Sequence, residues 1–156
     1  MQRTNVPASV NVLKVAAEHD PSEPPLDRTK ARVLGPMIGA RDLGATIYQL
    51  APGDRVSPYH YELGNEEWLL VLAGHPTVRQ PDGEAVLAPW DLVCFPDGPD
   101  GAHAIANRTE EPVRLMVIST VQSPAIAVQL DSAKIGIWPP GKLFRDADAV
   151  DFWEGE

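Results

Sequence analysis

The stretch GDRVSPYHYELGNEEWLLVLAG, residues 53–74, decides the fold of this chain because it combines strand-forming residues with three possible metal ligands. The ligands are His60, Glu62 and Glu67, and a Gly-Asn turn separates the second from the third. If the segments on the two sides of that turn are neighbouring strands, period-two alternation places His60 and Glu62 on one face, and Glu67 meets them from the adjacent strand. The stretch therefore predicts part of a metal site built on β-structure.

A second segment later in the chain completes a recognisable pattern. It reads DLVCFPDG, residues 91–98, and it is followed by His103 and Asn107. Together the two segments resemble the two-part signature of the cupins, whose first part is present here, with gaps of six, one, four and six residues, as Gly53, His60, Glu62, Glu67 and Gly74. The resemblance covers residues 43–120.

The resemblance implies an all-β fold, the cupin double-stranded β-helix or jelly-roll barrel, with a metal site inside it. It transfers a metal role to His60, Glu67 and His103. Glu62 stands where the family usually has a second histidine, so the predicted ligand set is His60, Glu62, Glu67 and His103. Two other roles stay open for Glu62, which either bends outward or holds a metal-bound water. For the whole cluster the alternative is a metal-free, hydrogen-bonded core, although two buried carboxylates without partners would be costly.

One turn departs from the family's pattern. Trp90 follows Ala88 and Pro89 at a position where glycine is usual. A type II turn would need a positive φ at Trp90, which is costly for a large side chain. We therefore predict a type I turn.

Composition limits the class of protein. The chain has 156 residues, enough for one domain with a substantial core, and its formal net charge is -9. This charge disfavours nucleic acid and anionic membrane as main partners. Cys94 is the only cysteine, so an intrachain disulfide is excluded, and its apolar neighbours predict a buried, inert thiol. The first residues lack a secretory pattern and no segment is apolar for the length of a bilayer, which predicts a cytoplasmic protein.

The chain is expected to divide into an N-terminal arm over residues 1–41, the barrel over 42–140 and an acidic tail over 141–156. Turns rich in Pro, Gly, Asn and Asp separate the expected strands, which are 43–50, 56–62, 66–73, 76–80, 84–88, 91–95, 102–107, 112–120, 125–130 and 134–138. One or two further short strands are expected in the arm, and residues 146–153 of the tail are expected to form about two helical turns with Val150 and Trp153 as apolar anchors.

Residues 68–72 are apolar on both strand faces, so the outer face needs a cover. The second sheet, the N-terminal arm and another subunit are the three candidates. Because dimerisation through such sheets is frequent among the proteins this chain resembles, we predict a homodimer.

Several chemistry-bearing residues are placed outside the site. The opposite strand parity of Glu66 predicts a solvated carboxylate, and His75 is expected at a rim. Tyr59 and Tyr61 have the opposite parity to His60 and are expected on the barrel exterior. We also leave out His19, which lies in the proline-rich arm, and Asp131, which is expected in a turn.

Two neutral imidazoles with one or two carboxylates suit a single divalent transition metal, namely Fe, Mn, Ni, Co or Zn. The predicted function is a small metalloenzyme acting on a small organic molecule in the barrel, as an oxygenase, a decarboxylase or an isomerase. No catalytic residue is assigned and no organic cofactor is expected. The alternatives are a non-catalytic binding or sensor module, and a metal-free epimerase with His103 as base beside a tyrosine acid.

Overall fold

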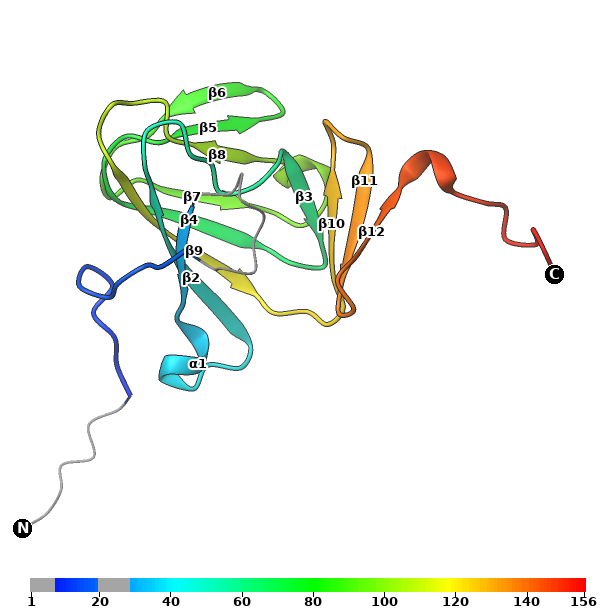
Figure 1. Cartoon of the computed structure of the whole chain (residues 1–156), viewed down its shortest axis with the longest axis horizontal. Helices are drawn as coiled ribbons and strands as arrows, with labels where there is room; N and C mark the ends of the chain where they lie inside the picture. The colour runs from blue at the N-terminus through cyan, green and yellow to red at the C-terminus, as the bar shows by residue number, and fades with distance from the viewer. Residues whose placement is uncertain (1–7, 20–28) are drawn as a thin grey trace, which may run out of the picture.

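The computed structural model describes residues 8–19 and 29–156, and their strands form antiparallel sheets with few helical turns (Figure 1). The five-stranded sheet has the order β1 (Lys30–Val33), β2 (Leu43–Leu50), β9 (Val113–Thr120), β4 (Glu67–Ala73) and β7 (Leu92–Phe95). The three-stranded sheet has the order β6 (Gly83–Val86), β5 (Thr77–Gln80) and β8 (Ala104–Ala106). The four-stranded sheet has the order β12 (Lys142–Arg145), β11 (Lys134–Trp138), β10 (Ala125–Gln129) and β3 (His60–Leu63). The predicted all-β class is confirmed.

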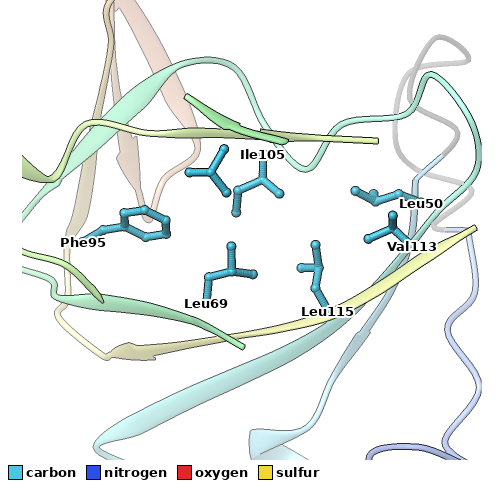
Figure 2. Packing of buried hydrophobic residues seen from close by; sticks show 7 residues of the cluster. Leu50, Leu69, Phe95, Ile105, Val113 and Leu115 are labelled. Atoms are coloured by element: carbon cyan, nitrogen blue, oxygen red, sulfur yellow. The ribbon is translucent and has the colours of Figure 1, made fainter. Parts of the chain in front are cut away.

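The main core lies between the five-stranded sheet and the three-stranded sheet (Figure 2). Alternation explains it, because Leu69 and Val71 on β4 point inward while their neighbours point outward. Figure 2 shows Leu69 and Leu115 from the first sheet below Ile105 from β8, with Phe95 closing one end. Glu67 has the same strand parity as Leu69, so the sequence aims this carboxyl group into the same interior.

A pair of backbone hydrogen bonds joins the three-stranded sheet to the four-stranded sheet. The amide of His60 donates to the carbonyl of His103 over 3.1 Å, and the amide of His103 donates to the carbonyl of His60 over 2.8 Å. This isolated antiparallel bridge places β3 beside the start of β8, so the two sheets form one wall of the barrel. The two halves of the sequence motif meet at this bridge. Figure 1 shows β3, β10, β11 and β12 side by side at one end of the molecule.

The N-terminal arm covers part of the outer face of the five-stranded sheet. Val10, Val12 and Val15 pack on a second cluster that includes Leu72. The guanidinium of Arg114 on β9 holds the arm, donating to the Val12 and Val15 carbonyl oxygens over distances as short as 2.6 Å. The sequence allowed the second sheet, the N-terminal arm or another subunit to cover this face. Over this part of the face, the cover is the arm. Trp68, at the other end of β4, keeps 43% of its surface exposed.

The expected strands are present with shifted ends. The strand expected at 56–62 begins only at His60, because Pro58 lacks an amide proton and the residues before it form bends. Ahead of them, Arg55 makes an isolated bridge with Ala106. The sequence did not predict β12, which pairs with β11 inside the segment expected to be a tail.

The helical turns are short. Near the start of the barrel lies α1 (Gly35–Ile38), and η1 (Pro99–Gly101) precedes His103. In the tail, η2 (Asp146–Asp148) is the only helical segment assigned, so the prediction of about two turns through residue 153 was wrong. Val150 and Trp153 are 67% and 73% exposed, so they do not anchor a helix on the barrel. None of the helices in the described residues has the length and apolar character needed to cross a membrane.

Two further predictions from the sequence were wrong. Cys94 is exposed, because Phe95 and Val93 take the inward parity of β7 and leave Cys94 on the outer face opposite Trp68. Trp90 has a φ of 77°, which is the conformation of a type II turn. Its amide donates to the Val71 carbonyl over 2.8 Å, and its ring is largely exposed, so the sheet contact fixes the backbone while the side chain avoids a clash.

Candidate metal centre

Two histidines from opposite ends of the motif lie side by side on the barrel wall. His60 is the first residue of β3, and His103 lies between η1 and β8. The bridge between their backbones sets their rings 4.8 Å apart, centroid to centroid. The geometry thus joins side chains that the sequence separates by 43 residues.

Backbone carbonyl groups orient both imidazoles. Nδ1 of His60 lies 2.9 Å from the carbonyl oxygen of Pro58, and Nδ1 of His103 lies 2.9 Å from that of Gly101. A carbonyl oxygen only accepts, so each Nδ1 carries the proton and each Nε2 keeps its lone pair. Gly101 is required here because a Cβ at this position would lie 1.8 Å from the Pro96 carbonyl oxygen. The loop backbone therefore fixes the tautomer that a metal-binding histidine needs.

The carboxyl group of Glu67 faces both of these lone pairs. Its Oε2 lies 3.4 Å from Nε2 of His103 and 4.0 Å from Nε2 of His60. This oxygen is buried and has no hydrogen-bond partner among the described residues. Burial and the nearby charge of Glu62 raise the pKa of Glu67 to about 7. A buried acceptor without a partner is unusual, and it points to a group that these residues are built to bind.

The three side chains fit a divalent ion. Their ligand atoms all lie within 4.8 Å of one another. Neighbouring ligands of an ion with bonds of about 2.1 Å lie roughly 3.0–3.5 Å apart. The 3.4 Å between Glu67 and His103 is already in this range, and the wider separations would close around the ion. The metal-free alternative fits less well, because 3.4 Å is too long for a hydrogen bond between the Glu67 carboxyl group and His103.

His103 is the most enclosed member of the cluster. Its ring stacks on Phe95 with 3.7 Å between centroids and an interplanar angle of 8°. Burial lowers the pKa of His103 to about 4, so its imidazole is neutral at physiological pH. The side chains of His60 and Glu67 are 12% and 16% exposed to solvent. The cluster is therefore packed on the Phe95 side, while His60 and Glu67 keep a small exposed fraction.

Glu62 lies beside this cluster and outside the group of three. Its Oε1 is 3.7 Å from Nε2 of His60, close enough to approach the same ion. A hydrogen bond from Asn65 holds the carboxylate, while burial raises its pKa. The Asn65 oxygen in turn accepts from the amide of Gln122 over 3.0 Å. Of the four predicted ligands, three thus converge directly, and the direct ligation of Glu62 stays a prediction.

The other chemistry-bearing residues lie away from the cluster. Glu66 accepts a hydrogen bond from the Trp68 indole over 2.8 Å at the surface. His75 is exposed, with Nδ1 near the Leu87 carbonyl oxygen. The ring of Tyr59 packs against Arg79 outside the barrel, as its parity predicted. His19 is exposed in the arm.

Sequence reasoning missed Asn65 and Phe95 as supports of the site. Asn65 was treated as a turn residue, although its side chain reaches both Glu62 and Gln122 in the loop between β9 and β10. Phe95 faces Glu67 across the pair β4 and β7, so its inward parity was a usable signal for a wall of the site. The carbonyl groups that orient the histidines left no signal in the sequence.

Comparison with known proteins identifies the family. Residues 46–119 match the family model of the cupin domain, Cupin_2. The chain belongs to the cupins and is a small single-domain member. No curated protein sequence matches the chain significantly.

Solved structures agree with this fold. A sugar phosphate isomerase of the cupin superfamily from Silicibacter pomeroyi DSS-3 superposes with a TM-score of 0.78 at 21% identity, over 90% of this chain and 94% of that one. A putative sugar phosphate isomerase from Acidithiobacillus ferrooxidans gives 0.72 at 26% identity, over 81% of each chain. The polyketide cyclase RemF from Streptomyces resistomycificus gives 0.59 at 24% identity, over 80% of this chain and 83% of that one. The first and third similarities support the fold alone.

Proposed function

We propose that this cupin is a metal-dependent isomerase of a small hydroxy-carbonyl compound bound at the metal cluster of the barrel. The observation that carries the proposal is the unpartnered Oε2 of Glu67, which faces the free Nε2 atoms of His60 and His103. These three residues would hold one divalent transition metal, with two neutral nitrogens and one carboxylate. When bound, such an ion supplies Lewis-acid polarisation of a substrate carbonyl oxygen.

Glu62 is the group that favours proton transfer over the other reactions considered. It is partly buried, its pKa is raised, and Asn65 fixes its direction beside the three ligands. A carboxylate in this place would accept a proton from the carbon next to a carbonyl group and return it to the former carbonyl carbon, while the proton of the substrate hydroxyl passes to the former carbonyl oxygen. No oxidant or second substrate is needed for this shift. The fold similarity to a putative sugar phosphate isomerase at 26% identity supports the same class of reaction.

Protein purified without an affinity tag provides the first test. Elemental analysis should find about one transition-metal ion per chain. The protein is then incubated in D₂O with a panel of small aldoses, ketoses and their phosphate esters, and proton NMR follows deuterium entering the carbon next to the carbonyl. Glu62→Gln should retain the metal and lose the exchange, while Glu66→Gln is the matched exposed control.

The outcomes separate the candidate functions. Exchange that needs both the metal and Glu62 supports the isomerase. Saturable binding of a panel compound without exchange would replace it by a non-catalytic binding module. A protein that neither contains nor accepts a metal would remove the site assignment itself.

We also propose that the chain forms a homodimer through the outer face of the five-stranded sheet. Trp68 is 43% exposed there, Leu92 is 57% exposed, and Cys94 lies opposite Trp68 in register. The arm covers the other part of this face, so the exposed end is the part that needs a partner. Light scattering at micromolar concentration should give twice the chain mass, and Trp68→Lys should shift the mass toward the monomer. A monomeric mass for the native chain would contradict this part of the proposal.

A further inference from the structure

A hollow of about 170 Å³ lies on the outer face of the three-stranded sheet. Its floor contains Thr77 of β5 and Ala104 and Ala106 of β8, and Thr77 is directly opposite Ala106. Residues between them, Val78 and Ile105, point the other way into the core. The hollow is therefore on the opposite side of the sheet from the core, and the small side chains of the two alanines leave it open.

Three arginines line this hollow. Arg79 lies on β5 directly opposite Ala104, and Arg108 follows β8. Arg55 arrives from a different part of the chain, and its bridge with Ala106 turns its side chain to the same face. The convergence of three guanidinium groups on one small concave surface contrasts with the chain's formal net charge of -9.

Two of the guanidinium groups are held in place by carboxylates. Arg79 makes a bidentate pair with Asp131 at 2.7 and 3.1 Å, and its Cζ lies 3.8 Å from the centre of the Tyr59 ring. Arg108 makes a bidentate pair with Glu84 at 2.6 and 2.7 Å. A guanidinium group has five N–H donors, so each keeps donors for a further acceptor. The pairs fix the position of both groups before any ligand binds.

Arg55 supplies the uncompensated charge. It makes no ion pair among the residues that the structure describes, whereas Asp131 and Glu84 compensate the other two arginines. The five charged groups at the hollow therefore sum to one positive charge. Planar guanidinium groups bind oxyanions in preference to other anions, because their donors match the spacing of paired oxygens.

We propose that this hollow is a second binding site, and that it takes the phosphate group of a small molecule. The site is separate from the metal centre, because the imidazole of His60 belongs to the inner cluster and Arg55, Arg79 and Arg108 lie on the outer face. The inference does not rest on the proposed isomerase activity.

Calorimetric titration of the full chain with inorganic phosphate tests the site. Arg55→Ala should weaken phosphate binding by about tenfold, because it removes the one unpaired positive charge. Arg55→Lys should weaken it less, since the charge is kept and the bidentate geometry is lost. The matched control is Arg41→Ala, an exposed arginine that does not line the hollow and should leave the affinity unchanged.

Two further measurements make the result of the titration decisive. Glycerol 3-phosphate in place of inorganic phosphate shows whether the site prefers an ester to the free ion. His103→Ala should retain phosphate affinity even when it has lost its metal, which separates a failure here from a failure of the metal centre. Equal phosphate affinity in Arg55→Ala and Arg41→Ala, or no phosphate binding by the native chain, would overturn the proposal.

Discussion

Asn107 is a buried polar residue of the motif and Glu67 is a partly buried one, and their surroundings differ completely. The Asn107 amide donates to the carbonyl oxygens of Leu50 and Glu111 at 3.1 and 2.8 Å, and its oxygen accepts from the amide and hydroxyl of Thr109. Glu67 has a buried oxygen with no hydrogen-bond partner among the described residues, and it faces the Nε2 atoms of two imidazoles. The chain itself satisfies the side chain of Asn107, whereas it leaves Oε2 of Glu67 without a partner among the described residues.

This difference separates structure from function within one motif. A buried polar group whose hydrogen bonds all come from the chain contributes to stability. A buried group that the chain leaves unpaired costs stability and persists where it has a ligand. Hydrogen-bond satisfaction, more than burial alone, thus predicts a folding role for Asn107 and a metal role for Glu67.

The largest expected effect is the loss of metal from histidine variants. His60→Ala and His103→Ala should each lower the metal content from about one ion per chain to near zero, because each removes one of three converging ligands. Asn107→Ala should retain the ion in whatever fraction remains folded. Elemental analysis of the purified variants checks this. Unchanged metal in both histidine variants would show that the cluster is not a metal centre.

Asn107→Ala should lower the free energy of unfolding by about 3 kcal/mol, since it removes the hydrogen bonds to Leu50 and Glu111 and leaves two carbonyl groups unsatisfied. Urea denaturation followed by circular dichroism measures the loss. Thr109→Val, which removes only the hydroxyl partner, is the graded control and should cost less. If Asn107→Ala lowers the free energy of unfolding by less than Thr109→Val does, Asn107 does not hold the turn that contains Thr109 and Glu111.

The pH dependence of the metal-free protein tests Glu67. Its pKa of about 7 in the folded chain is above the ordinary value of 4.5, so ionisation opposes folding. Stability should fall as the pH rises from 4.5 through 7, by up to about 3 kcal/mol, and Glu67→Gln should remove this fall. His103 has the opposite dependence, because its pKa of about 4 is below 6.5 and stability is lost as the pH falls between these values.

The measurement is the free energy of unfolding of chelator-treated protein, obtained by denaturation at several pH values. At each pH the value for a variant is subtracted from the value for the native chain. Glu66→Gln is the exposed control. If the native chain and Glu67→Gln differ by the same amount at pH 4.5 and pH 8, the Glu67 carboxyl group is not buried as the structure has it.

The smallest effect on metal binding is expected at Glu62, which resembles Asn107 in having a hydrogen-bond partner within the chain. Because Asn65 holds its carboxylate beside the cluster, Glu62→Ala should weaken metal affinity by no more than about tenfold, far less than His60→Ala. Competition with a chelator measures both affinities. A loss as large as that of His60→Ala would make Glu62 the fourth ligand, and Glu62→His should then retain the ion.

Much of the fold and part of the site were predictable from local pattern. Strand alternation put His60 and Glu62 on one face, and turn residues marked the ends of most strands. The spacing of the two motif segments predicted the cupin barrel that the comparisons confirm. The exposed thiol of Cys94 was not predicted, because residues 92–95 are apolar on both faces and composition does not show which face is covered.

The sequence by itself determined which residues are candidates for the metal site, since residue type and strand parity are local properties. Only the tertiary structure decided how they act together. The bridge between His60 and His103, the carbonyl groups that leave both Nε2 atoms free, and the missing partner of Glu67 all depend on segments far apart in the chain. Hydrogen-bond satisfaction is a property of the assembled surroundings, so it becomes visible only when the barrel is closed.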